Sequence, residues 1–181
     1  MYKNKRQSFD IPGHAHFLTF SCFRRCQIFS NELACILLAE SLKLARQKLE
    51  FDLWSYVFMP DHIHLLIHPR NEKYSTSQIL KEIKGPFAKK LLKVWRESNE
   101  NILKDLAVES SGRAEYRVWE RGGGFDKNLY SVDKIRAAIA YIEENPVRKG
   151  LVSNVKDWKW SSARAHLNEN ACLLDIDRIV A

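Results

Sequence analysis

Two histidines separated by a single residue are the most distinctive chemical feature of this sequence. His62 and His64 open the run His62-Ile63-His64-Leu65-Leu66-Ile67-His68, whose composition is typical of a β-strand. Side chains alternate between the faces of a strand, so both imidazoles are expected on one face with Cβ atoms about 6–7 Å apart. One divalent metal ion can bridge that distance. The alternative is a pair of surface histidines without a ligand, which the apolar context disfavours.

Two imidazoles do not complete a metal site, so a third ligand must come from elsewhere. His68 has the same parity, but it lies at the far end of the run beside Pro69 and is interpreted as a surface residue. The segment before Pro146 offers Tyr141 and Asn145, which are four residues apart and would share one face of a helix. An Asn carboxamide oxygen is compatible with Mg²⁺ or Mn²⁺ alongside imidazoles.

Tyr141 is the candidate nucleophile. It lies outside the apolar stripe expected for its helix, which comprises Ile135, Ala138, Ile139 and Ile142. A phenol has a pKa of about 10, so its attack on a phosphate requires a base, a nearby cation or an activated phosphate. A metal beside the phenol would polarise a phosphate oxygen, which makes phosphoryl transfer the matching reaction. A boundary tyrosine with a structural hydrogen bond is the alternative.

Composition narrows the class of protein and of partner. The chain has 181 residues, of which 45% are hydrophobic and 28% charged, which excludes wholesale disorder. Its net charge of +7 favours a polyanionic partner, although many basic proteins bind none. The four cysteines form no CxxC pair and are expected to be reduced thiols. With no run approaching the ~18 apolar residues of a membrane span and no signal-peptide core, we expect a cytoplasmic protein that has no membrane partner.

Strands are expected over 16–23, 52–58 and 62–68. Met59-Pro60-Asp61 predicts a tight turn that joins the last two strands in an antiparallel hairpin. A further short strand is expected at Tyr116–Trp119.

Three helices should position the candidate residues. The first runs to about residue 49 after a cap at 29–31, and Leu33, Ile36, Leu37, Leu42, Leu44 and Leu49 are expected to carry it. The second covers roughly 78–96 after a cap at Ser75 or Ser77, with a kink or split at Gly85-Pro86. The third begins at Ser131 or Asp133 and ends before Pro146.

The order strand, helix, strand, strand, helix, strand, helix predicts an α+β fold of the ferredoxin-like or RRM-like type. We expect an antiparallel sheet with helices packed on one side of it. The whole chain, 1–181, is interpreted as one domain with a core at about 14–165, a polar loop or insertion at about 97–115 and a C-terminal tail.

Basic side chains are candidates for contacting the phosphates of a nucleic acid. The candidates are Arg117, Arg121, Lys127, Arg148 and Lys149, with further cations on the second helix at Lys81, Lys84, Lys89, Lys90, Lys93 and Arg96. Nearby Phe125, Tyr130, Trp158 and Trp160 could stack unpaired bases, although a core role is favoured for at least one of the tryptophans. A solvated surface is the alternative for each basic cluster. Gly122-Gly123-Gly124 matches no nucleotide-binding motif and indicates a close backbone approach or a flexible loop.

Three segments together resemble the REP-associated branch of the single-tyrosine transposases. Residues 56–67, YVFMPDHIHLLI, resemble the His-hydrophobic-His (HUH) strand of that superfamily. Residues 141–152, YIEENPVRKGLV, resemble its catalytic helix, and 158–164, WKWSSAR, resemble the tryptophan-serine tail common in the branch. The similarity runs from about His16 to Ala165, with the motifs in the expected order.

This resemblance implies an HUH endonuclease fold and a metal-dependent endonuclease and strand transferase acting on single-stranded, hairpin-forming, REP-like DNA. It implies that Tyr141 forms a 5′-phosphotyrosine link and that His62 and His64 bind Mg²⁺ or Mn²⁺. Asn145 stands where the third ligand is expected, a position usually occupied by Gln in the insertion-sequence branch. A hairpin-binding protein without catalysis and a metal phosphodiesterase that uses water remain open as alternatives. The resemblance leaves the choice between monomer and homodimer undecided.

Overall fold

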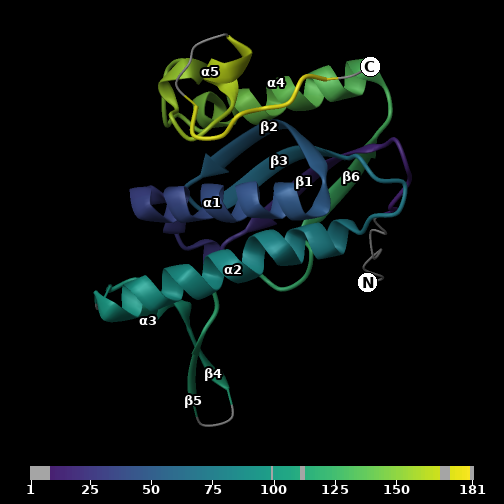
Figure 1. Cartoon of the computed structure of the whole chain (residues 1–181). Coiled ribbons are helices and arrows are strands. Elements are labelled where there is room, and N and C mark those ends of the chain that lie inside the picture. The colour runs from purple at the N-terminus through teal and green to yellow at the C-terminus, as the bar shows by residue number, and fades with distance from the viewer. Residues whose placement is uncertain (1–8, 99, 111–112, 168–171, 180–181) are drawn as a thin grey trace, which may run out of the picture.

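The fold is a four-stranded antiparallel sheet between two helical layers. The computed structural model describes residues 9–98, 100–110, 113–167 and 172–179. The strands are β1 (Ala15–Ser21), β2 (Phe51–Met59), β3 (His62–Pro69) and β6 (Phe125–Leu129), in the spatial order β2-β3-β1-β6. The long helices are α1 (Glu32–Leu49), α2 (Thr76–Glu97) and α4 (Val132–Arg148). Figure 1 shows α4 on one side of the sheet and α1 and α2 on the other.

The expected α+β class is confirmed, but the expectation that helices cover only one side of the sheet is wrong. Two separate hydrophobic clusters form because alternate residues of the strands face opposite layers. Val57 and Leu66 face α4, where they pack with Ile142. The apolar stripe of α4 could not be buried on the other face, which α1 and α2 already occupy.

The hairpin of β2 and β3 confirms the predicted strands and turn. Met59 pairs with His62 across the turn. Two further hydrogen bonds hold the turn, because Pro60 O accepts from the Phe29 N–H at 3.0 Å and Asp61 O accepts from the Cys22 N–H at 2.9 Å. The residue before the histidines is therefore tied to the end of β1.

The fourth strand of the sheet is β6, and the prediction of a strand at 116–119 is wrong. Tyr116 ends another strand, and Trp119 forms only an isolated bridge with Cys22. Residues 125–129 have the sequence FDKNL, which contains no β-branched residue and gives only a weak strand signal. Pairing with β1 at the edge of the sheet decides their conformation.

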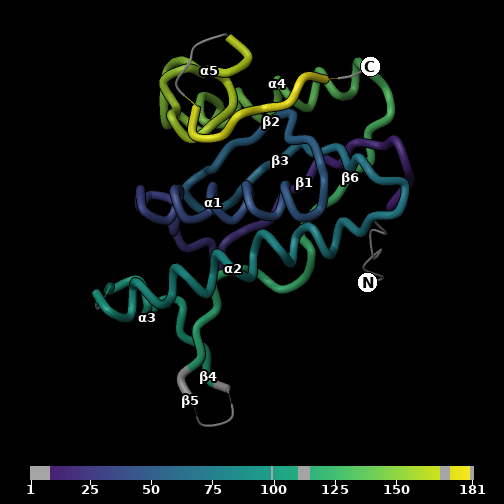
Figure 2. Tube along the Cα trace, in the orientation of Figure 1, coloured from purple at the N-terminus to yellow at the C-terminus, as the bar shows by residue number. Residues whose placement is uncertain are grey.

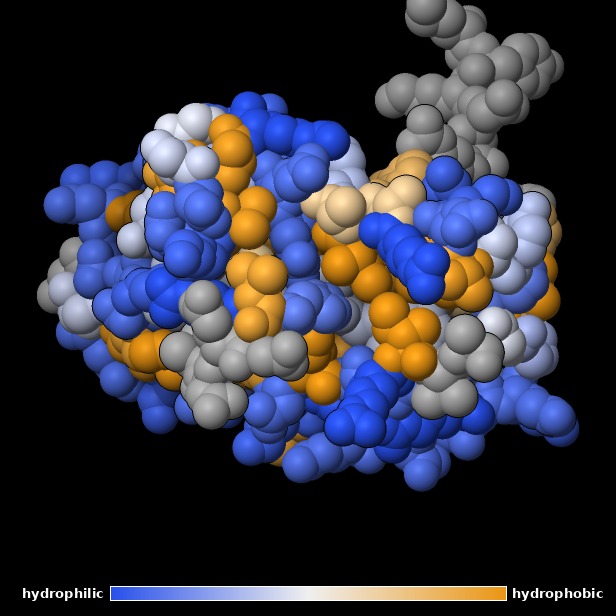
Figure 3. Space-filling view, turned by 90° about the horizontal axis from the view of Figure 1, so that it is seen from above, coloured by the Kyte–Doolittle hydropathy of each residue, from blue (hydrophilic) through white to orange (hydrophobic). Residues whose placement is uncertain are grey.

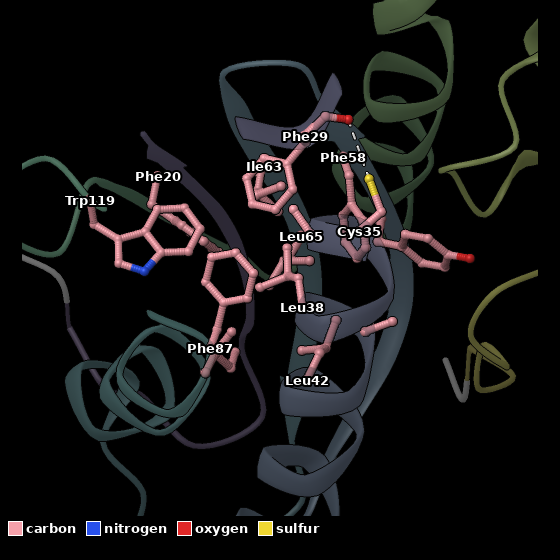
Figure 4. Packing of buried hydrophobic residues seen from close by; sticks show 14 of the residues in the cluster. Phe20, Phe29, Cys35, Leu38, Leu42, Phe58, Ile63, Leu65, Phe87 and Trp119 are labelled. Carbon is pink, nitrogen blue, oxygen red and sulfur yellow. Dashed lines mark hydrogen bonds between the residues drawn. The ribbon is translucent and has the colours of Figure 1, made fainter. Parts of the chain in front are cut away.

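The main core lies between the sheet and helices α1 and α2. Asn31 caps α1 as expected, since its Oδ1 accepts from the Ala34 N–H at 3.2 Å. Figure 4 shows Cys35, Leu38 and Leu42 of α1 directed at the sheet, and the Cys35 thiol donates to Phe29 O at 3.3 Å.

The expected apolar face of α1 is wrong in part. Leu42 is buried, but Leu33, Ile36 and Leu44 are exposed at 39%, 38% and 55%. Small residues, among them Ala34, Ala39 and Ala45, occupy buried positions of the same helix.

Neither proline splits or ends its helix, so the expected split of α2 and the expected end of α4 are both wrong. Helix α2 continues through Gly85-Pro86, which lie on its exposed surface, where water can satisfy the carbonyl that loses its partner. Helix α4 continues through Pro146 to Arg148, so the prediction that it ends before Pro146 is wrong. Because Pro146 is in the last turn, few hydrogen bonds are affected, and Asn145 keeps helical geometry one turn after Tyr141.

Residues 97–115 were expected to form a polar loop or insertion and instead contain regular structure. They include α3 (Leu103–Leu106), β4 (Ala107–Ser110) and most of β5 (Arg113–Tyr116). Figures 1 and 2 show the β4–β5 hairpin extending away from the sheet. Its base is held by the buried Leu106 and by the Arg96 guanidinium, which lies 4.9 Å from the centroid of the Tyr116 ring.

The C-terminal segments cover the open edge of β2. Phe58 N–H donates to Trp160 O at 2.8 Å, and Trp158 Nε1 donates to Phe58 O at 3.0 Å. Trp158 and Trp160 pack on the two hydrophobic clusters, as favoured for at least one of them. Further along, before the short α5 (Ala163–His166), Ser162 N–H donates to Tyr56 O. No helix within the described residues is long and apolar enough to cross a membrane.

Gly124 is expected to be the glycine least tolerant of a side chain. Its φ is +82°, and an added Cβ would lie 2.1 Å from Thr19 O. Gly124→Ala should lower the free energy of unfolding by about 2–4 kcal/mol, because backbone strain and a clash combine. Urea denaturation measures this loss.

Gly13→Ala is the matched control for that measurement. Gly13 has a similar φ of +78° but open space around it, so its substitution should cost only about 1 kcal/mol of strain. Equal losses in the two variants would contradict the close approach of Gly124 to β1.

Candidate active site

The alternation of β3 places His62 and His64 on the face that α4 covers. Ile63 and Leu65 point into the main core on the opposite face. His64 is 5% exposed, whereas His62 at the start of the strand is half-buried. The sequence prediction that the two imidazoles share one face is confirmed.

Three nitrogen atoms gather at this point. His62 Nε2 and His64 Nε2 lie 3.2 Å apart, and the side-chain amide of Asn145 lies 3.1 Å from His64 Nε2. Asn145 is 4% exposed and reaches the histidines from α4, 81 residues further along the chain. The structure thus brings together the three residues that the sequence proposes as metal ligands.

Second contacts fix the orientation of both imidazoles. Asp61 Oδ1 accepts from His62 Nδ1 at 2.6 Å, which leaves the lone pair of a neutral ring on Nε2. The Asp61 carboxylate is itself paired with Arg25 at 3.3 Å. Thr19 Oγ1 lies 2.7 Å from His64 Nδ1, so the His64 ring can likewise present a lone pair at Nε2.

Burial keeps His64 neutral at ordinary pH. It lowers the pKa of this imidazole from 6.5 to about 3, with smaller contributions from His62 and Arg25. A neutral imidazole is the form that ligates metals. The environment therefore favours the state of His64 that a cation needs.

The donor set fits a divalent metal ion. Two imidazole lone pairs facing each other at 3.2 Å repel unless a proton or cation lies between them. Within the described residues, no three His, Cys, Asp or Glu side chains form a metal-binding group, so a third protein ligand would have to be of another type. Asn145 meets this need, because its amide can turn its oxygen toward the histidines.

Tyr141 lies beside this cluster on the surface of α4. Its side chain is 40% exposed, and its ring centroid is 5.6 Å from that of His64. Phe17 of β1 contacts it edge-on at 5.8 Å, and the Arg148 guanidinium lies 5.1 Å from its ring centroid. All these groups come from one chain, so the cluster forms without a second copy.

The five proposed DNA-binding residues lie at different distances from this cluster. Arg148 contacts the Tyr141 ring, and Lys149 caps the end of α4. Lys127 pairs in register with Phe17 and shares its face of the sheet. Arg117 instead lies over the Phe23 ring at 5.1 Å, and Arg121 is exposed in the turn before Gly122.

Figure 3 shows the face above α4 as a mosaic of hydrophilic and hydrophobic residues.

Sequence reasoning missed the residues that orient the site. Thr19 and Phe17 carry no motif, because only the pairing of β1 with β3 brings them to His64. Asp61 could have been found, since it directly precedes His62 and a carboxylate often orients a ligating histidine. Arg25 could not, because it reaches Asp61 from a left-handed turn with φ +56°.

The low pKa of His64 predicts a loss of stability in acid. Between pH 6.5 and about 3 the unfolded chain binds a proton that folded His64 does not, so the free energy of unfolding falls as pH falls. The expected loss between pH 7.5 and 5 is about 1–2 kcal/mol, measured by urea denaturation. The His64→Gln variant should lose this part of the pH dependence; an unchanged slope would contradict the assignment.

Comparison with known proteins agrees with this geometry. The family model described as "Transposase IS200 like" matches residues 13–112, more than half of the chain. A protein of Haemophilus influenzae named "Putative REP-associated tyrosine transposase" is 35% identical over 113 residues, which cover 62% of this chain. The match spans only 58% of the length of that relative.

A solved structure has the same fold. It is that of a REP-associated tyrosine transposase bound to a REP hairpin, with a TM-score of 0.69, 18% identity, and coverage of 98% of this chain and 99% of the other. The sequence-based resemblance to this group is thus confirmed by an independent match of sequence and of fold. The chain belongs to the IS200-like transposase family.

Proposed function

We propose that this protein is a metal-dependent endonuclease and strand transferase that acts on single-stranded, hairpin-forming DNA of the REP type. Tyr141 would be its nucleophile, and His62, His64 and Asn145 would hold Mg²⁺ or Mn²⁺. The observation that carries the proposal is the cluster of these four side chains, with a tyrosine ring 5.6 Å from the ring of a buried, neutral histidine. Family membership and the hairpin-bound relative of the same fold support it.

The covalent step would be a displacement at the scissile phosphate. Tyr141 Oη would bond to phosphorus as the bond to the 3′-oxygen breaks, giving a 5′-phosphotyrosine link and a free 3′-hydroxyl. The phenol loses its proton and the leaving oxygen gains one. Attack of a 3′-hydroxyl on the link would rejoin DNA and release Tyr141, with no loss of phosphate bond energy.

Residues of this chain would divide the remaining tasks. A bound divalent cation would polarise a phosphate oxygen. Asp61 and Thr19 would hold the two imidazoles in the ligating orientation, as their contacts at 2.6 and 2.7 Å suggest. Arg148, with its guanidinium over the Tyr141 ring, would contribute positive charge where the phosphate approaches.

The partner would be hairpin or single-stranded DNA. The net charge of +7 favours association with a polyanion, and Lys127 and Arg148 bring cations to the face that carries Tyr141. One chain holds all four groups, so a monomer could carry out the cleavage step, and a homodimer would pair two such sites.

Tyr141→Phe should abolish the covalent protein–DNA adduct, because no other group at the site can form the phosphotyrosine bond. Labelled hairpin DNA with a single-stranded flank is incubated with Mn²⁺ and resolved on a denaturing gel. The variant should still bind the DNA, and its free energy of unfolding should change by less than about 0.5 kcal/mol, since the exposed hydroxyl is outside the core.

Tyr130→Phe is the control for that assay, because Tyr130 is also exposed, at 65%, and should leave the adduct intact. An adduct that moves to Tyr130 or Tyr116 would mean that another tyrosine is the nucleophile. Cleavage by Tyr141→Phe without an adduct would favour a phosphodiesterase that uses water. Binding by the wild type with no cleavage would favour a hairpin-binding protein.

His64→Ala should weaken Mn²⁺ binding by more than about tenfold, because it removes a central donor. Isothermal titration calorimetry measures the affinity. His68→Ala is the matched control, since His68 lies on the same face of β3 but stacks on Trp54 at 4.8 Å, away from the cluster. Equal affinities of wild type and His64→Ala would rule out the metal site.

A further inference from the structure

Glu143 is a mostly buried carboxylate of α4 that has no part in the proposed cleavage step. Its side chain is 14% exposed, and it lies two residues from both Tyr141 and Asn145. A carboxylate is costly to bury unless its oxygens accept hydrogen bonds. The partners of this side chain therefore indicate what holds the second half of α4 in place.

Both hydrogen-bond partners of Glu143 come from the chain that follows α4. Its Oε1 accepts from the Ser162 hydroxyl at 3.0 Å and contacts Nδ1 of His166 in α5. Figure 1 shows α5 alongside α4, on the same side of the sheet. Glu143 thus connects α4 to the C-terminal segment that covers the edge of β2.

Ser162 continues this connection into β2. It is fully buried, its N–H donates to Tyr56 O at 2.9 Å, and its Oγ accepts from the Tyr56 N–H at 3.1 Å. The Ser55 hydroxyl lies 2.9 Å from the same Oγ. A series of hydrogen bonds therefore runs from the backbone of β2 through Ser162 to the Glu143 carboxylate, and hydrogen bonds are stronger where water is excluded.

The position of Glu143 around α4 allows this connection to fix the rotation of the helix about its axis. At about 100° per residue, Tyr141 and Asn145 lie about 40° apart around the axis, and Glu143 lies about 160° from each of them. Ile142 lies between the two flanks and is fully buried against the sheet. The helix is therefore attached on both flanks, to the histidines through Asn145 and to β2 through Glu143.

Small rotations of α4 would matter for the chemistry. The apolar contacts of the helix fix its rotation only loosely, because hydrophobic attraction has no direction. A rotation of about 20° would move a phenol oxygen that is roughly 8 Å from the axis by roughly 3 Å. Misplacement by about 1 Å can lower the rate of a reaction about 10²-fold. A directional contact on the flank opposite Tyr141 therefore affects the site even though it touches none of its groups.

We propose that Glu143 is a positioning residue for the cleavage reaction. Through Ser162, it holds α4 in the rotation that directs Tyr141 and Asn145 at the histidines. This inference rests on the proposed function, since it assigns Glu143 a task in the reaction of Tyr141. Within the described residues, the hydrogen bonds of Glu143 reach none of the four side chains of the site, so it would act only through the helix.

Three substitutions of Glu143 separate the reach of the side chain from its charge. Glu143→Ala removes the contact, and Glu143→Asp keeps the charge but is one methylene too short to reach Ser162. Glu143→Gln loses the charge but keeps an oxygen that accepts from Ser162. The measurement is single-turnover adduct formation with Mn²⁺ and saturating labelled hairpin DNA.

The Ala and Asp variants should form the adduct about tenfold more slowly or worse, whereas the Gln variant should stay within about threefold of the wild type. DNA affinity should change less than about twofold in all three, because the loss is confined to the geometry of the reacting groups. If Glu143→Ala does not fold, the comparison of Glu143→Asp with Glu143→Gln carries the same test.

Asp177→Ala is the matched control. Asp177 is also a carboxylate that connects the C-terminal segment to β2, since it accepts from the Leu53 N–H at 2.8 Å, but its ion pairs are with Arg46 and Arg70 and not with α4. It should lower the urea midpoint, as Glu143→Ala does, and leave the adduct rate within about twofold of the wild type. Equal slowing by Asp177→Ala and Glu143→Ala would assign the effect to stability and overturn the proposal.

A second readout needs neither DNA nor metal. The Asn145 side-chain amide is buried and lies 3.1 Å from His64 Nε2, so its NMR signals should be shifted away from those of a free amide. Glu143→Ala and Glu143→Asp should abolish that shift, and Glu143→Gln and Asp177→Ala should retain it.

Unchanged adduct formation by Glu143→Ala, failure of Glu143→Gln to restore it, or Asn145 signals that do not respond to Glu143→Ala would each overturn the proposal. Absence of an adduct with the wild type, while the Asn145 signals depend on Glu143 as expected, would instead refute the proposed cleavage and leave Glu143 as the residue that orients α4. The two failures are therefore distinguishable.

Discussion

The two-residue alternation of β3 is the constraint on which the rest of this structure depends. β3 lies between β2 and β1, and its two faces pack against different helical layers. Ile63 and Leu65 enter the main core, while His62 and His64 meet α4. A slip of one residue in register would exchange the two sets and bury imidazoles among the leucines of α1. The hydrogen bonds from Phe29 N–H to Pro60 O and from Cys22 N–H to Asp61 O fix the turn and so oppose that slip.

Burial of polar groups at the centre of the site explains why so many contacts converge there. His64 and Asn145 are both more than nine-tenths buried, and a buried polar atom without a partner is costly. The Asn145 amide and His64 Nε2 are partners of each other, and Thr19 Oγ1 is the partner of His64 Nδ1. Asp61 in turn holds the neighbouring His62. These hydrogen bonds lower the free-energy cost of burying polar groups, and they also fix the orientation of the imidazole rings. The contacts that stabilise the buried side chains are therefore the same contacts that orient them as metal ligands.

The two edges of the sheet differ in a way that bears on access. The edge of β2 is closed by the backbone of 158–162 and by Asp177, which accepts from the Leu53 N–H at 2.8 Å. At the opposite side, β6 is short, and Phe125 and Lys127 lie on its α4 face close to Phe17. An extended ligand near Tyr141 would therefore find open, basic and aromatic surface toward β6, and a closed wall toward β2.

Local patterns in the sequence determined the strands around the turn at Pro60 and the beginning of α1 at Asn31. They also determined the shared face of His62 and His64 and the helical spacing of Tyr141 and Asn145. Each of these features depends on backbone periodicity or on a helix cap. Tertiary structure alone decided that FDKNL would be the fourth strand, that α4 would cover the second face and continue through Pro146, and that residues 103–116 would form a helical turn and a hairpin. It also decided which residues orient the histidines: Thr19 and Arg25 lie 45 and 36 positions from the residues they contact, and only strand pairing and a left-handed turn bring them there. Periodicity is a property of neighbouring residues and can be read along the chain, whereas burial and pairing between distant segments arise only when the chain has folded.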